Sequence, residues 1–187
     1  SGMPRKKYDA DLAHHQEGLM DVLNHAGINL LWRDNDGGCK GACNRIPHTD
    51  MTQWKLDQFC KDKSCIDDVD LYRLNETLDG LKQDTVLVIH LMGSHGPAYY
   101  QRYPAQYRRF TPTCDTNEIQ DCDHQALMNT YDNTILYTDS VVSRTIDALK
   151  ARQATMNTAL VYLSDHGESL GENGLYLHGT PYMLAPE

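Results

Sequence analysis

The chain has 187 residues, which is enough for a domain with a sizeable hydrophobic core. Its 26 acidic and 17 basic residues give a formal net charge of −9, which argues against a nucleic-acid partner because phosphate contacts need a basic surface. No apolar run reaches the roughly 18 residues that a membrane-spanning helix needs, and no signal peptide is visible. The first residues, SGMPRKKYD, and the last, YMLAPE, do not resemble natural termini, so we expect a segment of a longer protein.

The first half of the chain alternates between helix and strand patterns. Residues 9–27 predict a helix that ends at a glycine, with one apolar stripe formed by Leu12, Leu19, Val22, Leu23 and Ala26. An apolar strand is predicted at 28–32, and a polar, cysteine-containing stretch follows it. Residues 68–82 predict a second helix, because Leu71, Leu74, Leu78 and Leu81 recur at helical spacing. The run TVLVIHLM at 85–92 is apolar throughout, as in a strand that is buried on both faces.

The second half repeats the alternation. A long helix is predicted at 123–152, with Asp123 placed to cap its start, and a third apolar strand, TALVYLS, is predicted at 158–164. Apolar strands that alternate with helices are typical of a parallel sheet covered by helices on both faces. The sequence therefore predicts an α/β/α sandwich with a mainly parallel central sheet.

The six cysteines fall into three local pairs, namely Cys39 with Cys43, Cys60 with Cys65, and Cys114 with Cys122. A zinc site would favour C-x2-C or C-x4-C knuckles, whereas the three spacings here differ from one another. An even number of locally paired cysteines favours three disulfides and therefore an oxidising compartment, such as the bacterial periplasm. Zinc knuckles and free thiols are the alternatives.

Polar and reactive residues follow each predicted strand. Asn35 and Lys40 come after the first strand, His95 lies in GSHGP after the second, and Asp165 and His166 lie in SDHGE after the third. Because parallel strands end at the same edge of a sheet, and ligands bind beyond their carboxyl ends, these side chains are expected to converge.

The pair Asp165 and His166 offers one carboxylate oxygen and one imidazole nitrogen, a combination that suits zinc. Neighbouring residues on a strand point to opposite faces, so both can bind one ion only where the strand has ended, and Gly167 permits that turn. His178 and His95 would add further ligands. The alternative is a capping aspartate beside a buried structural histidine.

Such a metal site fits phosphoryl or sulfuryl transfer, in which the metal polarises the transferred group. Glu168 would hydrogen-bond a metal-bound histidine or a cationic substrate group, and Lys40 would neutralise a phosphate. Ser94 and Ser164 each precede a candidate histidine, but neither opens a helix, and no serine or threonine in the chain fits the nucleophile well.

Several long motifs resemble the phosphoethanolamine–lipid A transferases of the mobile colistin-resistance type, within the alkaline phosphatase and sulfatase superfamily. They are WRDNDGGCKGACNRIPH, GSHGPAYYQRYP, FTPTCDTNEIQDC, NTYDNT, VYLSDHGESLGENGLYLHG and PYMLAP, and they extend along nearly the whole chain. The resemblance implies an α/β/α fold and a periplasmic catalytic domain carried by an N-terminal membrane domain. It also implies the local disulfide pairing above.

The resemblance also implies roles for individual residues. Asp165 and His166 match two ligands of the catalytic zinc, while His95 and His178 match histidines that hold a second zinc or contact the phosphoryl group. The family's residues near the substrate head group match Glu168, Lys40 and, less securely, Asn35. The family's threonine nucleophile and a glutamate zinc ligand would lie upstream of SGMP, so we expect residues 1–187 alone to be inactive.

The implied reaction uses one or two zinc ions, with phosphatidylethanolamine as donor and a lipid A phosphate as acceptor. Masking that phosphate would weaken the binding of polymyxins, including colistin. The expected location is the periplasmic face of the Gram-negative inner membrane, and the expected oligomeric state is a monomer. A hydrolytic phosphodiesterase or sulfatase of the same superfamily is the second hypothesis, and a disulfide-stapled binding module with structural histidines is the third.

Overall fold

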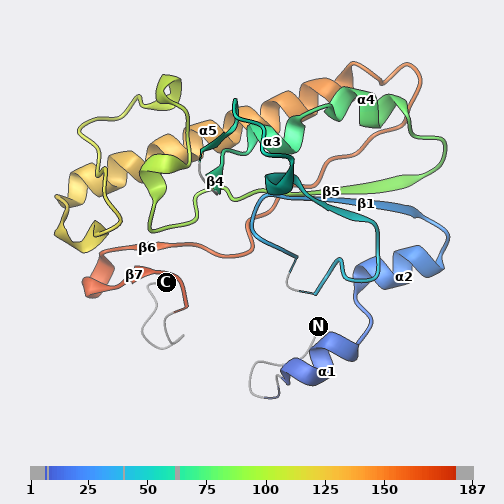
Figure 1. Cartoon of the computed structure of the whole chain (residues 1–187), viewed down its shortest axis with the longest axis horizontal. Helices are drawn as coiled ribbons and strands as arrows, with labels where there is room; N and C mark the ends of the chain where they lie inside the picture. The colour runs from blue at the N-terminus through green and yellow to red at the C-terminus, as the bar shows by residue number, and fades with distance from the viewer. Residues whose placement is uncertain (1–6, 8, 40, 62–63, 180–187) are drawn as a thin grey trace.

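A parallel sheet of three strands forms the centre of the computed structural model, which describes residues 7, 9–39, 41–61 and 64–179 (Figure 1). The strands are β1 (Asn29–Asp34), β2 (His48–Asp50) and β5 (Thr85–His90), in the order β2–β1–β5. In the β1–β5 pair, Asp34 lies opposite His90, so both strands end at the same level. The two strands predicted from the first half of the sequence are therefore confirmed, within two residues of the expected bounds.

Helices cover both faces of this sheet, as Figure 1 shows. On one side, α2 (Leu19–His25) contacts β1, and Leu23 packs against the apolar cluster around Leu30. On the other side lie α3 (Asp68–Leu71), α4 (Leu74–Asp79) and the long α5 (His124–Lys150), as predicted for an α/β/α sandwich. In the part of the chain that the structure describes, no helix is both long and apolar enough to cross a membrane.

Two predicted helices are each divided in two, which corrects the sequence prediction. The region 9–27 forms α1 (Ala10–His15) and α2, because Gly18 between them is extended and donates its N–H to the Asp21 carboxylate at 2.7 Å. The region 68–82 forms α3 and α4, because Arg73 adopts a left-handed conformation with φ of 53°. Apolar periodicity continues across both breaks, so the pattern alone does not reveal them.

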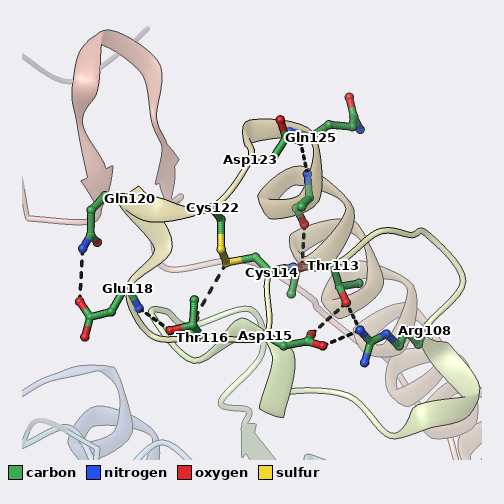
Figure 2. Close-up of a disulfide and its surroundings, with 12 residues drawn as sticks. Arg108, Thr113, Cys114, Asp115, Thr116, Glu118, Gln120, Cys122, Asp123 and Gln125 are labelled. Carbon is green, nitrogen blue, oxygen red and sulfur yellow. Dashed lines mark hydrogen bonds and ion pairs between the residues drawn. A yellow bond between two sulfur atoms is a disulfide. The ribbon is translucent and has the colours of Figure 1, made fainter.

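The long helix α5 begins where it was predicted to begin. The Asp123 carboxylate accepts hydrogen bonds from the N–H groups of Gln125 and Ala126, at 3.0 and 3.2 Å. Beside this cap, the Cys114–Cys122 disulfide closes the preceding loop against the first turns of the helix (Figure 2). All three predicted disulfides are present, and the Cys60–Cys65 bridge joins the short strands β3 (Cys60–Lys61) and β4 (Ser64–Cys65).

The prediction of a third sheet strand at 158–164 is wrong. Residues 158–164 form no strand, and Val161 and Leu163 are 83% and 72% exposed. A strand needs a neighbour for its backbone groups, and no described strand pairs with β5 on the edge opposite β1. Instead, residues 157–162 line an apolar cavity of about 250 Å³ together with side chains of β5, α4 and α5.

The remaining elements are short. The hairpin of β6 (Ser169–Leu170) and β7 (Tyr176–Leu177) follows the 158–164 segment, and β6 contacts α5. Single 3-10 turns complete the structure, at Met51–Trp54, Tyr99–Gln101, Ala105–Tyr107, Ile119–Asp121 and Glu172–Gly174.

Asp70 in α3 is a buried carboxyl group without a hydrogen-bond partner among the described residues. Burial, followed by the nearby charges of Asp67 and Asp34, raises the pKa of Asp70 from 3.8 to about 9. The group therefore keeps its proton in the folded protein at neutral pH, whereas in the unfolded chain it is ionised. Folding stability must then fall as the pH rises from about 4 to about 9.

We expect Asp70→Asn to flatten this dependence, because the amide carries no titrating proton. Between pH 5 and pH 8 the wild type should lose at least about 1 kcal/mol more unfolding free energy than the variant. Denaturant unfolding at several pH values measures the difference, with the exposed Asp57→Asn as control. Parallel pH curves for the wild type and Asp70→Asn would contradict the buried protonated state.

Candidate metal centre

His95 lies in the tight turn that follows β5. Its Nδ1 is hydrogen-bonded to the Gly96 carbonyl at 2.8 Å, and its own carbonyl accepts a hydrogen bond from Arg102 Nε at 2.9 Å. Gly93, two residues earlier, has φ of +55°, a conformation that glycine adopts without steric cost. The backbone around His95 is thus held from both sides, and because Nδ1 is engaged, Nε2 is the ring nitrogen that remains for a ligand.

Glu168 and His178 reach His95 from a distant part of the chain. The β6–β7 hairpin brings His178 back to Glu168, and His178 Nδ1 lies 3.1 Å from Glu168 Oε1. The Glu168 side chain is only 4% exposed, and it also accepts hydrogen bonds from Tyr99 Oη at 3.2 Å and the Gly96 N–H at 3.4 Å. Burial, with the Glu168 charge, raises the pKa of Tyr99, so this phenol remains a donor.

Together, His95, Glu168 and His178 form a group with the donor set of a metal site. One ligand atom from each lies within 4.8 Å of the others. Two imidazoles and a carboxylate are ligands that zinc uses in proteins, so the residues fit the metal that the sequence predicts. The structure places Glu168 within this group and in hydrogen-bond contact with His178, which is one of the two roles that the sequence suggests for it.

Asp165 and His166 lie on the solvent side of the same group. The His166 ring centroid is 4.2 Å from that of His178 and 6.3 Å from that of His95. The Asp165 side chain is 77% exposed, and its Oδ2 lies 3.6 Å from His166 Nε2. Three imidazoles and two carboxylates therefore gather at this end of β5, although the segment that carries Asp165 and His166 is not part of the sheet.

The other two predicted site residues are placed differently. Asn35 follows β1 but is 1% exposed, and its amide donates to Asp67 Oδ1 at 2.7 Å and to the Cys65 carbonyl at 3.1 Å. Lys40 lies outside the described residues. The structure thus brings together the predicted histidines and acids that follow β5 and the 158–164 segment. Asn35 is instead enclosed in the protein interior.

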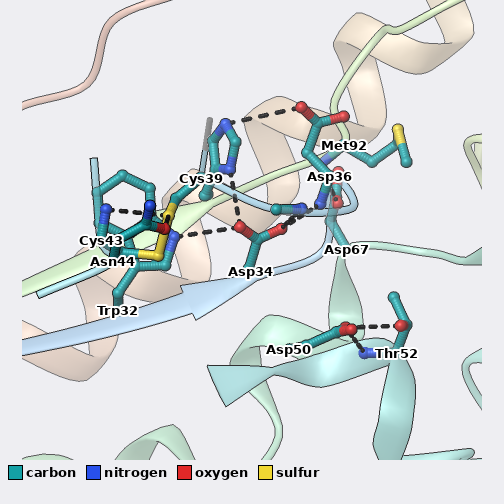
Figure 3. A network of polar contacts seen from close by, with 12 residues as sticks. Trp32, Asp34, Asp36, Cys39, Cys43, Asn44, Asp50, Thr52, Asp67 and Met92 are labelled. Carbon is teal, nitrogen blue, oxygen red and sulfur yellow. Dashed lines mark hydrogen bonds and ion pairs between the residues drawn. A yellow bond between two sulfur atoms is a disulfide. The ribbon is translucent and has the colours of Figure 1, made fainter. Parts of the chain in front are cut away.

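Sequence reasoning missed a network of acids at the ends of β1 and β5 (Figure 3). Asp34 accepts the N–H groups of Asp36 and Gly38 through Oδ1, at 2.9 and 3.0 Å, and the Trp32 Nε1–H through Oδ2. His90 at the end of β5 is part of this network, and its Nδ1 lies 3.3 Å from Asp34 Oδ2. These acids lie within polar stretches of the sequence, and no sequence signal distinguishes them from acids on the surface.

Comparisons with known proteins place the chain in a family. The family model described as Sulfatase matches residues 1–187. The chain belongs to the sulfatase family. It is 60% identical over 187 residues to "Phosphoethanolamine transferase EptA" of Salmonella typhimurium, covering 100% of this chain and 34% of the relative. It is 42% identical over 187 residues to "Phosphatidylethanolamine transferase Mcr-2" of Escherichia coli, covering 96% of this chain and 35% of the relative.

A solved structure agrees with the fold. The chain superimposes with a TM-score of 0.88 on the integral membrane protein lipooligosaccharide phosphoethanolamine transferase A (EptA) from Neisseria meningitidis, at 45% identity. The match covers 98% of this chain and 34% of that chain. The chain thus spans about a third of the length of these relatives, and both the resemblance and the α/β fold predicted from the sequence are confirmed.

We expect His178→Ala to lower zinc affinity at least tenfold, because it removes one imidazole from the group with His95 and Glu168. Competition with a chromophoric chelator measures the affinity. The matched control is His124→Ala, since His124 is exposed at the start of α5. Equal zinc affinity in wild type and His178→Ala would contradict a metal site at this position.

Proposed function

We propose that the full-length protein catalyses zinc-dependent transfer of phosphoethanolamine from phosphatidylethanolamine to a lipid A phosphate. The observation that supports this most directly is the gathering of His95, Glu168 and His178 beside Asp165 and His166, at the end of a parallel strand. The group occurs in a chain that is 60% identical to a protein named as a phosphoethanolamine transferase.

Each residue of the group has a distinct task in this proposal. Asp165 and His166 would hold the catalytic zinc, and His95 and His178 would hold a second zinc or bind the phosphoryl oxygens. Bound zinc supplies a Lewis acid that polarises the phosphoryl group. Glu168 fixes the His178 ring through its 3.1 Å contact, and Tyr99 in turn holds Glu168. Such supporting hydrogen bonds orient the imidazoles before the substrate arrives.

The chemistry also needs a nucleophile, which we place in a part of the full-length protein outside these 187 residues. The expected threonine would accept phosphoethanolamine from the donor and pass it to lipid A, which is a covalent two-step route. A glutamate zinc ligand is expected from the same part. Lys40 remains a candidate for the substrate head group.

Location and assembly complete the proposal. Three disulfides support an oxidising compartment, and we place the catalytic domain at the periplasmic face of the Gram-negative inner membrane, carried by a membrane domain outside this chain. We propose that the protein acts as a monomer. Modified lipid A would then give resistance to polymyxins, including colistin, because the masked phosphate loses negative charge.

A second candidate function is hydrolysis of a phosphodiester or sulfate ester, which is favoured by the match of the Sulfatase model to the whole chain. The two reactions differ in what accepts the phosphoryl group. A transferase delivers phosphoethanolamine to lipid A, whereas a hydrolase delivers it to water.

We expect membranes that contain the full-length protein to add phosphoethanolamine to lipid A, as measured by mass spectrometry. Because it removes a candidate zinc ligand, His166→Ala should reduce product by at least a factor of about 10³. His124→Ala should retain wild-type product. Chelation should abolish the product, and zinc should restore it. Release of free phosphoethanolamine without modified lipid A would instead favour the hydrolase, and full activity without metal would favour neither.

A polypeptide of residues 1–187 alone should show no transfer, because it carries no fitting nucleophile. Incubation with a fluorescent phosphatidylethanolamine and purified lipid A tests this, with the full-length protein in parallel. Turnover by the shorter polypeptide would place the nucleophile within the 187 residues.

A further inference from the structure

We infer that Asp67 is the positioning residue for the His95 turn, and that Asn35 serves the site through Asp67 rather than by touching substrate. The inference rests on the proposed function in so far as the His95 turn belongs to the active site. Its evidence is a set of buried contacts that join the ends of β1 and β5.

Asp67 lies just before α3 and is 1% exposed. Its carboxylate accepts three hydrogen bonds from two other parts of the chain. Oδ1 accepts the Asn35 amide at 2.7 Å and the Met92 N–H at 2.8 Å, and Oδ2 accepts the Gly93 N–H at 2.9 Å. Figure 3 shows Asp67 beside Met92, next to the Asp34 network.

The two backbone contacts fix the start of the turn that carries His95. The His95 N–H donates to the Met92 carbonyl at 3.3 Å. That carbonyl belongs to the same peptide group as the Gly93 N–H, so the contact of Asp67 with Gly93 also orients the acceptor of the His95 N–H. Arg102, which donates to the His95 carbonyl, holds the other end of the turn. Without the Asp67 side chain, the N–H groups of Met92 and Gly93 would lose their acceptor, and the turn would lose its contact with the residue that precedes α3.

Asn35 completes this anchor from the side of β1. Its amide group donates one hydrogen to Asp67 and the other to the Cys65 carbonyl, and the residue is 1% exposed. A residue so enclosed has no open surface for a substrate head group. Its effect on the reaction must therefore pass through the carboxylate of Asp67, which it orients.

The pKa of Asp67 is raised overall, because burial outweighs the contacts that favour its ionised form. Burial raises the pKa of Asp67, while the hydrogen bonds from Asn35, Gly93 and Met92 and the charge of Arg102 oppose that rise. The Asp67 side-chain oxygens accept the N–H groups of Met92 and Gly93 at 2.8 and 2.9 Å, and this geometry holds the start of the turn in place.

A double-mutant cycle in the full-length protein tests the inference. The variants are Asp67→Asn, Asn35→Ala and the double variant. Asp123→Asn is the matched control, because Asp123 also accepts two backbone N–H groups but anchors no candidate site residue. The first readout is kcat and KM for a fluorescent phosphatidylethanolamine. The second, which does not depend on activity, is the ring signal of His95 in protein labelled with ¹³C-histidine and assigned with His95→Gln.

We expect Asp67→Asn to lower kcat at least tenfold with KM within about twofold, and to shift the His95 ring signal while those of His48 and His124 stay in place. Asn35→Ala should act in the same direction but more weakly. The double variant should be no worse than Asp67→Asn, because both residues act through one contact. Asp123→Asn should leave the kinetics and the His95 signal unchanged.

Other outcomes separate the inference from the proposed function. An unmoved His95 signal in Asp67→Asn would overturn the positioning role, whatever the activity. Independent, multiplicative losses with a raised KM for Asn35→Ala would show that Asn35 touches the donor. A wild type that transfers nothing, yet shows the His95 shift in Asp67→Asn, would overturn the proposed function and support the positioning role. If Asp67→Asn does not fold, the His95 signal of Asn35→Ala decides alone.

Discussion

The parallel pairing of β1 with β5 is the constraint on which the rest of the structure depends. The register sets Asp34 opposite His90, and the Asn35 N–H extends the ladder by donating to the His90 carbonyl at 3.0 Å. Both strands therefore stop together, and the two loops that leave them start side by side. The loop after β5 carries His95, which is one member of the candidate metal centre.

Two buried acids hold the loops at this shared edge in place through hydrogen bonds to backbone N–H groups. Asp34 gathers the N–H groups of the loop after β1, and Asp67 gathers those at the start of the turn after β5. Backbone N–H groups near a strand end need acceptors, and a carboxylate can satisfy several of them at once. Local order at the site is therefore provided by side chains rather than by further sheet.

The candidate metal centre is completed by residues from a distant part of the sequence, Glu168 and His178. The Glu168 carboxylate accepts hydrogen bonds from Tyr99 Oη and the Gly96 N–H, and it also contacts His178 Nδ1. Because Glu168 contacts both the turn of His95 and the hairpin of His178, it links the two segments that supply the imidazoles. This link persists although residues 158–164, just before it, have no partner strand in the described chain.

The sequence alone determined the strands β1 and β5, the cap and course of α5 and the local disulfides, because each depends on local spacing or on an apolar run beside a polar turn. It also singled out the histidines His95, His166 and His178, whose rings the structure brings together. Only the tertiary structure decided that 158–164 stays outside the sheet, since pairing depends on a distant neighbour. It also decided that Asn35 is enclosed and that Asp67 supports the site. A buried aspartate and an exposed aspartate look the same in the sequence, and only long-range contacts in the folded chain distinguish them.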